Sequence, residues 1–117
     1  MSDAYELFRE GQQRLRKGLT AQATVPLERA RKLEPEKASI REALGIAYFR
    51  LERWQDAERE FRTIVEVLSP TDHYAHYALG RTLEHLGKTS EANGHYKLAS
   101  SMRPSSETYS SRILDLE

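Results

Sequence analysis

The chain has 117 residues, the length of one domain, and its 18 basic and 18 acidic residues give a formal net charge of zero. That balance argues against a general nucleic-acid binder, which usually carries an excess of basic residues. The absence of cysteine excludes disulfides and thiolate metal sites.

The beginning of the chain gives no sign of export or membrane insertion. The stretch MSDAYELFRE contains no basic segment followed by a long apolar run. No stretch approaches the roughly 18 apolar residues of a membrane span. We therefore expect a soluble, cytoplasmic protein that does not bind membranes.

Residues 4–37 form the first expected unit, a pair of helices with irregular features. Glu10 and Arg14 are polar where the later units have apolar residues, so the first helix is expected to be terminal and partly solvated. Pro26 falls inside the second helix and removes the backbone donor to the Gln22 carbonyl. We expect a kink or a late helix start there.

Residues 38–72 form the second unit, in which the helical period is clearest. Apolar residues recur at intervals of three and four on both sides of LERWQ, and no run alternates as a strand would. The apolar positions are Leu44, Ala47, Tyr48, Leu51, Ala57, Phe61, Ile64 and Leu68. This pattern predicts two helices and an all-α fold.

A glycine in the middle of a helix costs about 1 kcal/mol relative to alanine, so Gly45 needs an explanation. It has counterparts 34 residues earlier at Gly11 and 35 residues later at Gly80. Small, large and proline positions recur in the same way: Ala23, Ala57 and Ala92; Leu27, Phe61 and Tyr96; Pro35, Pro70 and Pro104. Such self-similarity indicates stacked helical hairpins.

The repeat suggests how each hairpin packs. We expect the glycines to face the small residues of the partner helix, Ala23, Ala57 and Ala92, so that the two backbones approach closely. The column of Leu27, Phe61 and Tyr96 is expected to fill the space towards the next hairpin. The one-residue difference in spacing places an extra residue between Val65 and Ser69, at a helix end or in a turn.

The third unit spans residues 73–106, and the tail after it has a helical pattern of its own. Ser105 or Ser106 can cap a helix start. Tyr109, Ile113 and Leu116 then form one apolar stripe. We expect a further helix over residues 107–117 that covers the third hairpin; the alternative is a frayed tail.

The motif LGIAYFRLERWQDAEREFRTI resembles the tetratricopeptide repeat family, and LGRTLEHLGKTSEANGHYKLA repeats it in the third unit. The first unit matches more weakly. The resemblance implies an α-solenoid of three hairpins with a C-terminal capping helix, wound as a right-handed superhelix. Residues 1–117 then form a single domain with repeats at about 4–37, 38–72 and 73–106 and a cap at 107–117.

No constellation for catalysis or metal binding stands out. His73 and His76 lie three apart with Asp72 beside them, but no third ligand has a defined spacing. Glu58 and Glu60 lie on a charge-rich helix face that we expect to be solvated. No phosphate loop, catalytic triad order or HExxH motif is present. The prediction is a protein that is not an enzyme and uses no cofactor or metal.

In the family, the first helices of successive hairpins line a concave groove that holds a peptide or a partner's helix. Transferred to this sequence, the groove combines aromatic and apolar residues with one basic edge. Its residues are Tyr5, Phe8, Gln12, Arg16, Glu42, Ile46, Phe49, Arg50, Tyr74, Tyr77, Arg81, Glu84 and His85. Tyr5 and Phe8 could instead pack only within the first hairpin. Trp54 is expected to pack between hairpins.

The leading hypothesis is therefore a protein-interaction module whose ligand is a peptide or helix with apolar anchors and acidic residues. The alternative is a self-associating scaffold subunit; an RNA-binding solenoid has less support because the net charge is zero. We expect no nucleic-acid partner and a monomer or weak homo-oligomer.

The best-known ligands of the family are carboxyl-terminal peptides of heat-shock chaperones, held by a clamp of Lys, Asn and Arg side chains. The matching positions here hold Phe8, Gln12, Ala43, Tyr74 and Ala78. We therefore expect no specific binding of such acidic-ended peptides.

Overall fold

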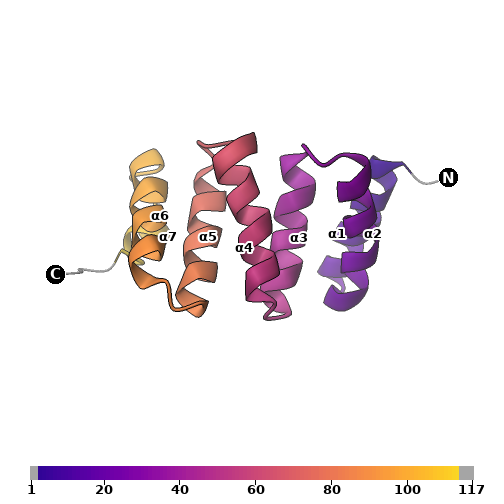
Figure 1. The fold of residues 1–117 in the computed structure, drawn as a ribbon, viewed down its shortest axis with the longest axis horizontal. Coiled ribbons are helices and arrows are strands. Elements are labelled where there is room, and N and C mark those ends of the chain that lie inside the picture. Colours follow the sequence, from indigo (N-terminus) through magenta and orange to yellow (C-terminus); the bar gives the residue numbers. More distant parts are fainter. Residues whose placement is uncertain (1–2, 114–117) are drawn as a thin grey trace.

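The computed structural model describes residues 3–113, and its helices form a single row (Figure 1). They are α1 (Ala4–Arg16), α2 (Thr20–Leu33), α3 (Ala38–Arg50), α4 (Trp54–Thr63), the π-helical turn η1 (Ile64–Leu68), α5 (His73–His85), α6 (Thr89–Met102) and α7 (Glu107–Ser110). The row extends over 53 × 24 × 22 Å. The described residues contain no strand, and the expected all-α solenoid is confirmed.

The helices pair as hairpins α1–α2, α3–α4 and α5–α6. Asp3 caps α1 by accepting a hydrogen bond from Glu6 N at 2.8 Å, and Asp72 caps α5 in the same way from Ala75 N at 3.0 Å. Gly18 and Gly87 turn the first and third hairpins with φ of 78° and 77°. The middle hairpin uses Glu52 at a φ of 59°, a conformation that costs a non-glycine residue free energy.

The recurring spacing of small and large residues serves packing inside each hairpin. A Cβ placed on Gly45 would lie 2.6 Å from the Phe61 ring, and one on Gly80 would lie 2.5 Å from the Tyr96 ring. Leu27 has the same relation to Gly11. The atoms closest to each glycine thus belong to the large residue of its own hairpin, a contact that the sequence analysis did not predict.

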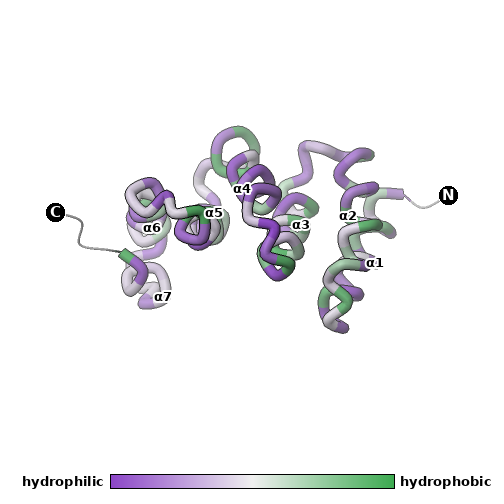
Figure 2. Tube along the Cα trace, turned by 60° about the horizontal axis from the view of Figure 1, so that its bottom comes forward, coloured by the Kyte–Doolittle hydropathy of each residue, from purple (hydrophilic) through white to green (hydrophobic). Residues whose placement is uncertain are grey.

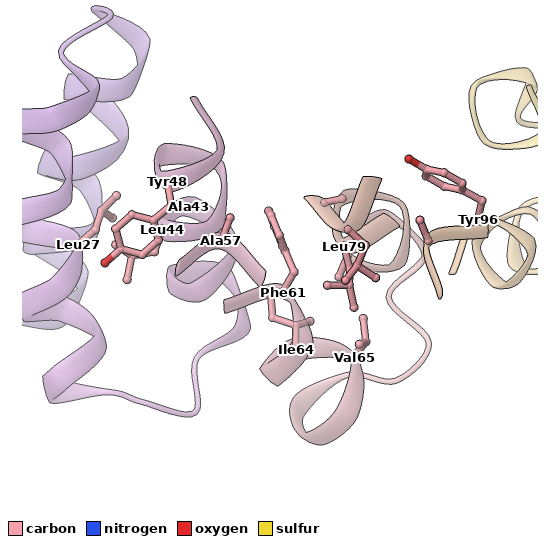
Figure 3. Close-up of a cluster of buried hydrophobic side chains, with 14 of the residues drawn as sticks. Leu27, Ala43, Leu44, Tyr48, Ala57, Phe61, Ile64, Val65, Leu79 and Tyr96 are labelled. Carbon is pink, nitrogen blue, oxygen red and sulfur yellow. The ribbon is translucent and has the colours of Figure 1, made fainter. Parts of the chain in front are cut away.

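These large residues belong to a continuous core. Phe61, Leu79 and Tyr96 are almost fully buried, together with Leu27 and Leu44 (Figure 3). The core runs from the first hairpin to the third without interruption, so each repeat depends on its neighbours for burial.

In the first repeat, two departures from the repeat pattern compensate each other. Helix α2 starts at Thr20 and continues past Pro26, so the expected late start was wrong. Pro26 cannot donate to the Gln22 carbonyl, and Arg14 of α1 donates to that oxygen instead, at 3.0 Å. The polar Arg14 therefore satisfies a backbone group that the proline leaves without its helical partner.

The extra residue of the second repeat lies in η1, the region that the spacing indicated. Ser69 N donates to Ile64 O at 2.7 Å, five residues back, which is the π-helical pattern. Ile64 and Val65 remain buried, while Val67 is 71% exposed. The insertion thus widens the last turn on its solvent side and leaves the buried face in place.

Helix α7 is shorter than expected. It begins with Ser106 as its cap, whose Oγ accepts from Tyr109 N at 3.3 Å, and it ends at Ser110. Arg112 N and Ile113 N then bond to carbonyls three residues back, as in a 3₁₀ turn. The serines at 110 and 111 favour turns over helix interiors, which explains the early end. Leu116 lies outside the described residues.

Glu60 also differs from the expectation of a solvated face. Its side chain is fully buried between α2, α3 and α4, where it accepts from Arg31 and, at 3.1 Å, from Arg41. Breaking a buried pair of this kind usually costs several kcal/mol, since a charge is left without a partner. Glu60 therefore joins the first hairpin to the second.

Candidate functional site

Three cavities follow one another along the side of the molecule formed by the first helix of each hairpin. The α1–α3 cavity has a volume of about 260 Å³, the α3–α5 cavity about 270 Å³ and the α5–α7 cavity about 330 Å³. In Figure 2, α7 lies on the same side of the row as α1. We call these three cavities together the groove.

Neighbouring cavities adjoin each other, because they share lining residues. Ile46 and Arg50 line both the α1–α3 and the α3–α5 cavity. Tyr74 and Tyr77 line both the α3–α5 and the α5–α7 cavity. The three cavities therefore lie side by side in a row from the first helix to the last.

An aromatic cluster fixes the wall between the second and third hairpins. The Trp54 and His85 rings stack with centroids 3.9 Å apart and planes 4° apart, and Phe49 meets both rings edge-on at 4.9 and 5.4 Å. Trp54 thus packs between hairpins, as its position indicated. The contact between Trp54 and Phe49 positions the Phe49 ring in the lining of the α3–α5 cavity.

Arg81 is held in place by aromatic rings. Its guanidinium lies 5.3 Å from the Phe49 ring centroid and 6.0 Å from that of Tyr77, and Nη1 donates to the Tyr77 hydroxyl at 3.3 Å. Contacts of this kind position a cation without neutralising it. The guanidinium keeps further donors for a ligand.

Glu42 introduces a carboxylate into the α1–α3 cavity. Burial, and next the negative charge of Asp72, raise the pKa of Glu42 above its ordinary value. Burial likewise raises the pKa of Tyr74, and Glu42 adds to that shift. The groove is thus partly dehydrated at its centre.

Several charges on α4 and α6 are paired with each other or with residues just before these helices. Arg62 bonds to Glu58 at 2.7 Å and to Glu91 at 2.6 Å, which joins α4 to α6, and Lys88 reaches Glu58 at 3.2 Å. Arg53 and Arg59 both contact Asp56. In residues 3–113, by contrast, the groove cations Arg16, Arg50 and Arg81 form no ion pair with a carboxylate.

Most of the residues expected to form the groove line one of its cavities. They are Phe8, Gln12, Arg16, Glu42, Ile46, Phe49, Arg50, Tyr74, Tyr77 and Arg81. Tyr5, Glu84 and His85 lie outside the three cavities. Tyr5 is 64% exposed beside Arg9, and His85 stacks on Trp54.

Residues near the C-terminus form a wall that the sequence did not reveal. Arg103, Ser105, Ser106, Thr108 and Tyr109 line the α5–α7 cavity. The serine cap was a usable signal for a helix start, but repeat spacing cannot indicate on which side of the row a non-repeated helix packs. The Tyr109 ring, 5.1 Å from Tyr77, fixes that position.

The histidines of α5 have structural partners. His73 Nδ1 lies 2.7 Å from the Tyr109 hydroxyl, and Arg103 Nη1 lies 3.3 Å from His73 Nε2. His76 is buried, with Nε2 donating to Pro70 O at 2.7 Å and Nδ1 lying 3.0 Å from His95 Nδ1. Over residues 3–113 no group of three or more potential metal ligands gathers.

The sequence profile of the tetratricopeptide repeat matches residues 8–73 and again residues 43–107, an offset of one repeat. The chain belongs to the tetratricopeptide repeat family. Its members generally act in protein–protein interactions. No curated protein matches the chain in sequence. In the described part of the chain, every helix is too short or too polar to cross a membrane.

Solved structures of tetratricopeptide proteins superimpose closely. The first such domain of Spaghetti (RPAP3), bound to the HSP90 peptide SRMEEVD, has a TM-score of 0.90 at 21% identity, over 95% of this chain and 87% of that one. MamA gives 0.90 at 23% identity, over 94% and 64%. The Arabidopsis OM64 domain gives 0.89 at 18% identity, over 94% and 90%. At these identities the likeness shows the fold.

Proposed function

We propose that this protein is an interaction module that binds a segment of another protein in the groove. The observation that carries the proposal is the row of adjoining cavities from α1 to α7, which share Ile46, Arg50, Tyr74 and Tyr77. An apolar groove of this length suits an extended chain or a helix. The Spaghetti domain, which has the same fold, is described with a bound peptide.

The chemistry of the lining supports a ligand with apolar anchors and acidic residues. Phe49, Tyr77 and Ile46 provide apolar contact in the middle of the groove. Arg16 and Arg50 are exposed along its edge. Central aromatic residues usually contribute most of the binding free energy, and charges on the rim mainly affect the rate of association.

The test uses a partner protein isolated by affinity capture on this protein. Tyr77→Ala should weaken its binding by about 2 kcal/mol or more, and Arg16→Ala should slow association and flatten its dependence on salt. Arg59→Glu on α4 is the matched control and should leave affinity unchanged. If Arg59→Glu abolishes binding while the groove variants do not, the protein works through its second helices.

Self-association is the competing function, in which a second copy fills the groove. Light scattering at several protein concentrations separates the two. A mass that rises with concentration, and that Tyr77→Ala returns to the monomer value, would favour the scaffold function. A mass of 13.5 kDa throughout would support the proposed module.

A further inference from the structure

The α3–α5 cavity differs in charge from its neighbour. Arg50 and Arg81 line it together with Ile46, Phe49, Tyr74 and Tyr77, and its lining contains no carboxylate. The α1–α3 cavity also has two arginines, but Glu42 stands among them. The middle cavity therefore combines aromatic surface with two arginines and no carboxylate in its lining. The α5–α7 cavity has aromatic walls as well, but a single arginine, Arg103.

A ligand that covers this cavity must deal with its cations. Arg81 lies against the Phe49 and Tyr77 rings, so an occupant of the cavity removes water from its guanidinium. Dehydrating a cation without giving it a partner is costly. A carboxylate on the ligand offsets that cost, because Arg and carboxylate form strong charge-assisted hydrogen bonds.

The size of the cavity suits one large side chain. A cavity of about 150 Å³ is enough to hold benzene, and the α3–α5 cavity has a volume of about 270 Å³. Its aromatic walls favour a Phe, Trp, Leu or Met side chain.

We propose that the α3–α5 cavity binds one aromatic or large aliphatic side chain of the partner together with a neighbouring Asp or Glu carboxylate, which Arg50 and Arg81 bind. This inference rests on the proposed function, since it specifies the ligand of the same groove. Arg81 supplies a fixed guanidinium, and the exposed Arg50 adjusts to the ligand.

The carboxylate comes from an internal side chain of the partner. The cavity adjoins the α1–α3 cavity on one side, with which it shares Ile46, and the α5–α7 cavity on the other, with which it shares Tyr74. A ligand that uses the whole groove therefore enters and leaves the middle cavity as a continuous chain, so its terminus lies elsewhere.

The experiment is a selection from displayed peptides. One library presents random twelve-residue segments flanked by glycine and serine at both ends, and a second presents random segments with a free carboxyl terminus. Segments from both libraries are selected for binding to the wild-type protein and, separately, to Arg81→Gln, Arg50→Gln and Tyr77→Ala. Arg59→Gln is the matched control, because Arg59 pairs with Asp56 on α4.

We expect the internal library to be enriched in Asp or Glu beside a large apolar residue. In Arg81→Gln the acidic preference should be lost while the apolar one remains, and Arg59→Gln should behave as wild type. For the best segment, replacing its acidic residue by the amide should weaken binding about tenfold in the wild type and much less in Arg81→Gln.

The contrary results separate the inference from the function. Two results would overturn the inference alone, in segments whose binding is lost in Tyr77→Ala. One is enrichment without a preference for acidic residues. The other is an acidic preference that persists in both Arg81→Gln and Arg50→Gln. Enrichment confined to the free-terminus library would also overturn it. Segments that bind Tyr77→Ala as well as wild type, or no enrichment in either library, would overturn the proposed groove function itself. Thermal melts of each variant establish that it is folded.

Discussion

Each first helix carries a glycine whose missing side chain leaves room for a large buried residue of the second helix. In the middle hairpin the pair is Gly45 and Phe61, and the Phe61 side chain is 1% exposed. The ring cannot move aside without disturbing Leu44 and Leu79 in the same core. The helix-propensity cost of glycine is therefore offset by dense packing around the ring.

We predict that Gly45→Ala destabilises the protein by about 1–3 kcal/mol, since its Cβ would lie 2.6 Å from the ring. Gly45→Leu should be worse. The matched control is Gly94→Ala in α6, where a Cβ would meet no atom within 4 Å. Gly94→Ala should stabilise the protein by up to about 1 kcal/mol. Urea unfolding measures the free energy of unfolding of each variant. Equal changes at both positions would contradict the close packing of α3 on α4.

Glu42 makes the groove sensitive to pH. Because its pKa is raised by burial and by Asp72, acidification from neutral pH protonates Glu42 earlier than an ordinary glutamate. Protonation removes a negative charge that repels an acidic ligand. The affinity of an acidic segment should therefore gain from Glu42 protonation as the pH falls through this raised pKa.

The corresponding prediction is that Glu42→Gln binds a displayed acidic segment severalfold more tightly than wild type at neutral pH, by removing one like charge from the groove. The difference between the two proteins should shrink as the pH falls. Fluorescence anisotropy of the labelled segment with both proteins across the pH range measures this. A difference that grows on acidification would contradict it.

At the scale of the helix, η1 shows how the solenoid absorbs one extra residue. The insertion lies after the last buried positions of α4, so Ile64 and Val65 keep their places in the core. The wide turn ends with Ser69 N bonded to Ile64 O. Removing one residue between them would restore the four-residue separation of an ordinary α-helix.

We therefore predict that deletion of Val67 is tolerated, with a loss of no more than about 1 kcal/mol, because Val67 is exposed and the turn can close as an α-helix. Deletion of Arg59, an exposed residue in α4, should prevent stable folding. That deletion turns the preceding residues by about 100° relative to Phe61 and so breaks the buried face. Circular dichroism and thermal melts compare the two, and equal loss of structure would contradict the insertion model.

The sequence predicted the elements that repeat, and the structure differs where a residue acts outside the repeat. Periodicity located the hairpins because the buried face of each helix recurs. It could not reveal that Arg14 satisfies the Gln22 carbonyl, or that Glu60 is buried, since both depend on contacts between helices. The position of Tyr109 beside Tyr77 likewise depends on the packing of a helix without a counterpart in the repeats.

At the scale of the whole molecule, the chain is more elongated than a compact domain. Its radius of gyration is 14.5 Å, against about 13 Å for a compact chain of this length. The groove cations Arg16, Arg50 and Arg81 have no ion pair within residues 3–113, while charges on α4 and α6 are paired across the two helices. Because the net charge is zero, this distribution, and not the total charge, determines where an acidic ligand is attracted.

The last prediction concerns the ligand class that the Spaghetti domain binds. The fold of that domain superimposes on this chain, but likeness of fold does not carry over its ligand. The positions at which the chaperone-peptide clamp needs cationic and amide side chains hold Phe8, Gln12, Ala43, Tyr74 and Ala78, and these residues line the groove here.

None of these five side chains is a cation that could offset the dehydration of a terminal carboxylate. The arginines of the groove, Arg16, Arg50 and Arg81, lie at other positions. We predict that the free terminal carboxylate of a peptide such as SRMEEVD contributes nothing to its binding here, so that the peptide and its carboxyl-terminal amide behave alike in calorimetry. The amide is the necessary control, because the internal Met and Glu of this peptide match the chemistry proposed for the α3–α5 cavity. Ala78→Arg with Tyr74→Lys should make binding depend on the free terminus, and the double change Ala78→Gln with Tyr74→Gln is its uncharged control. Saturable low-micromolar binding by the wild type that is lost in the amide would contradict the prediction.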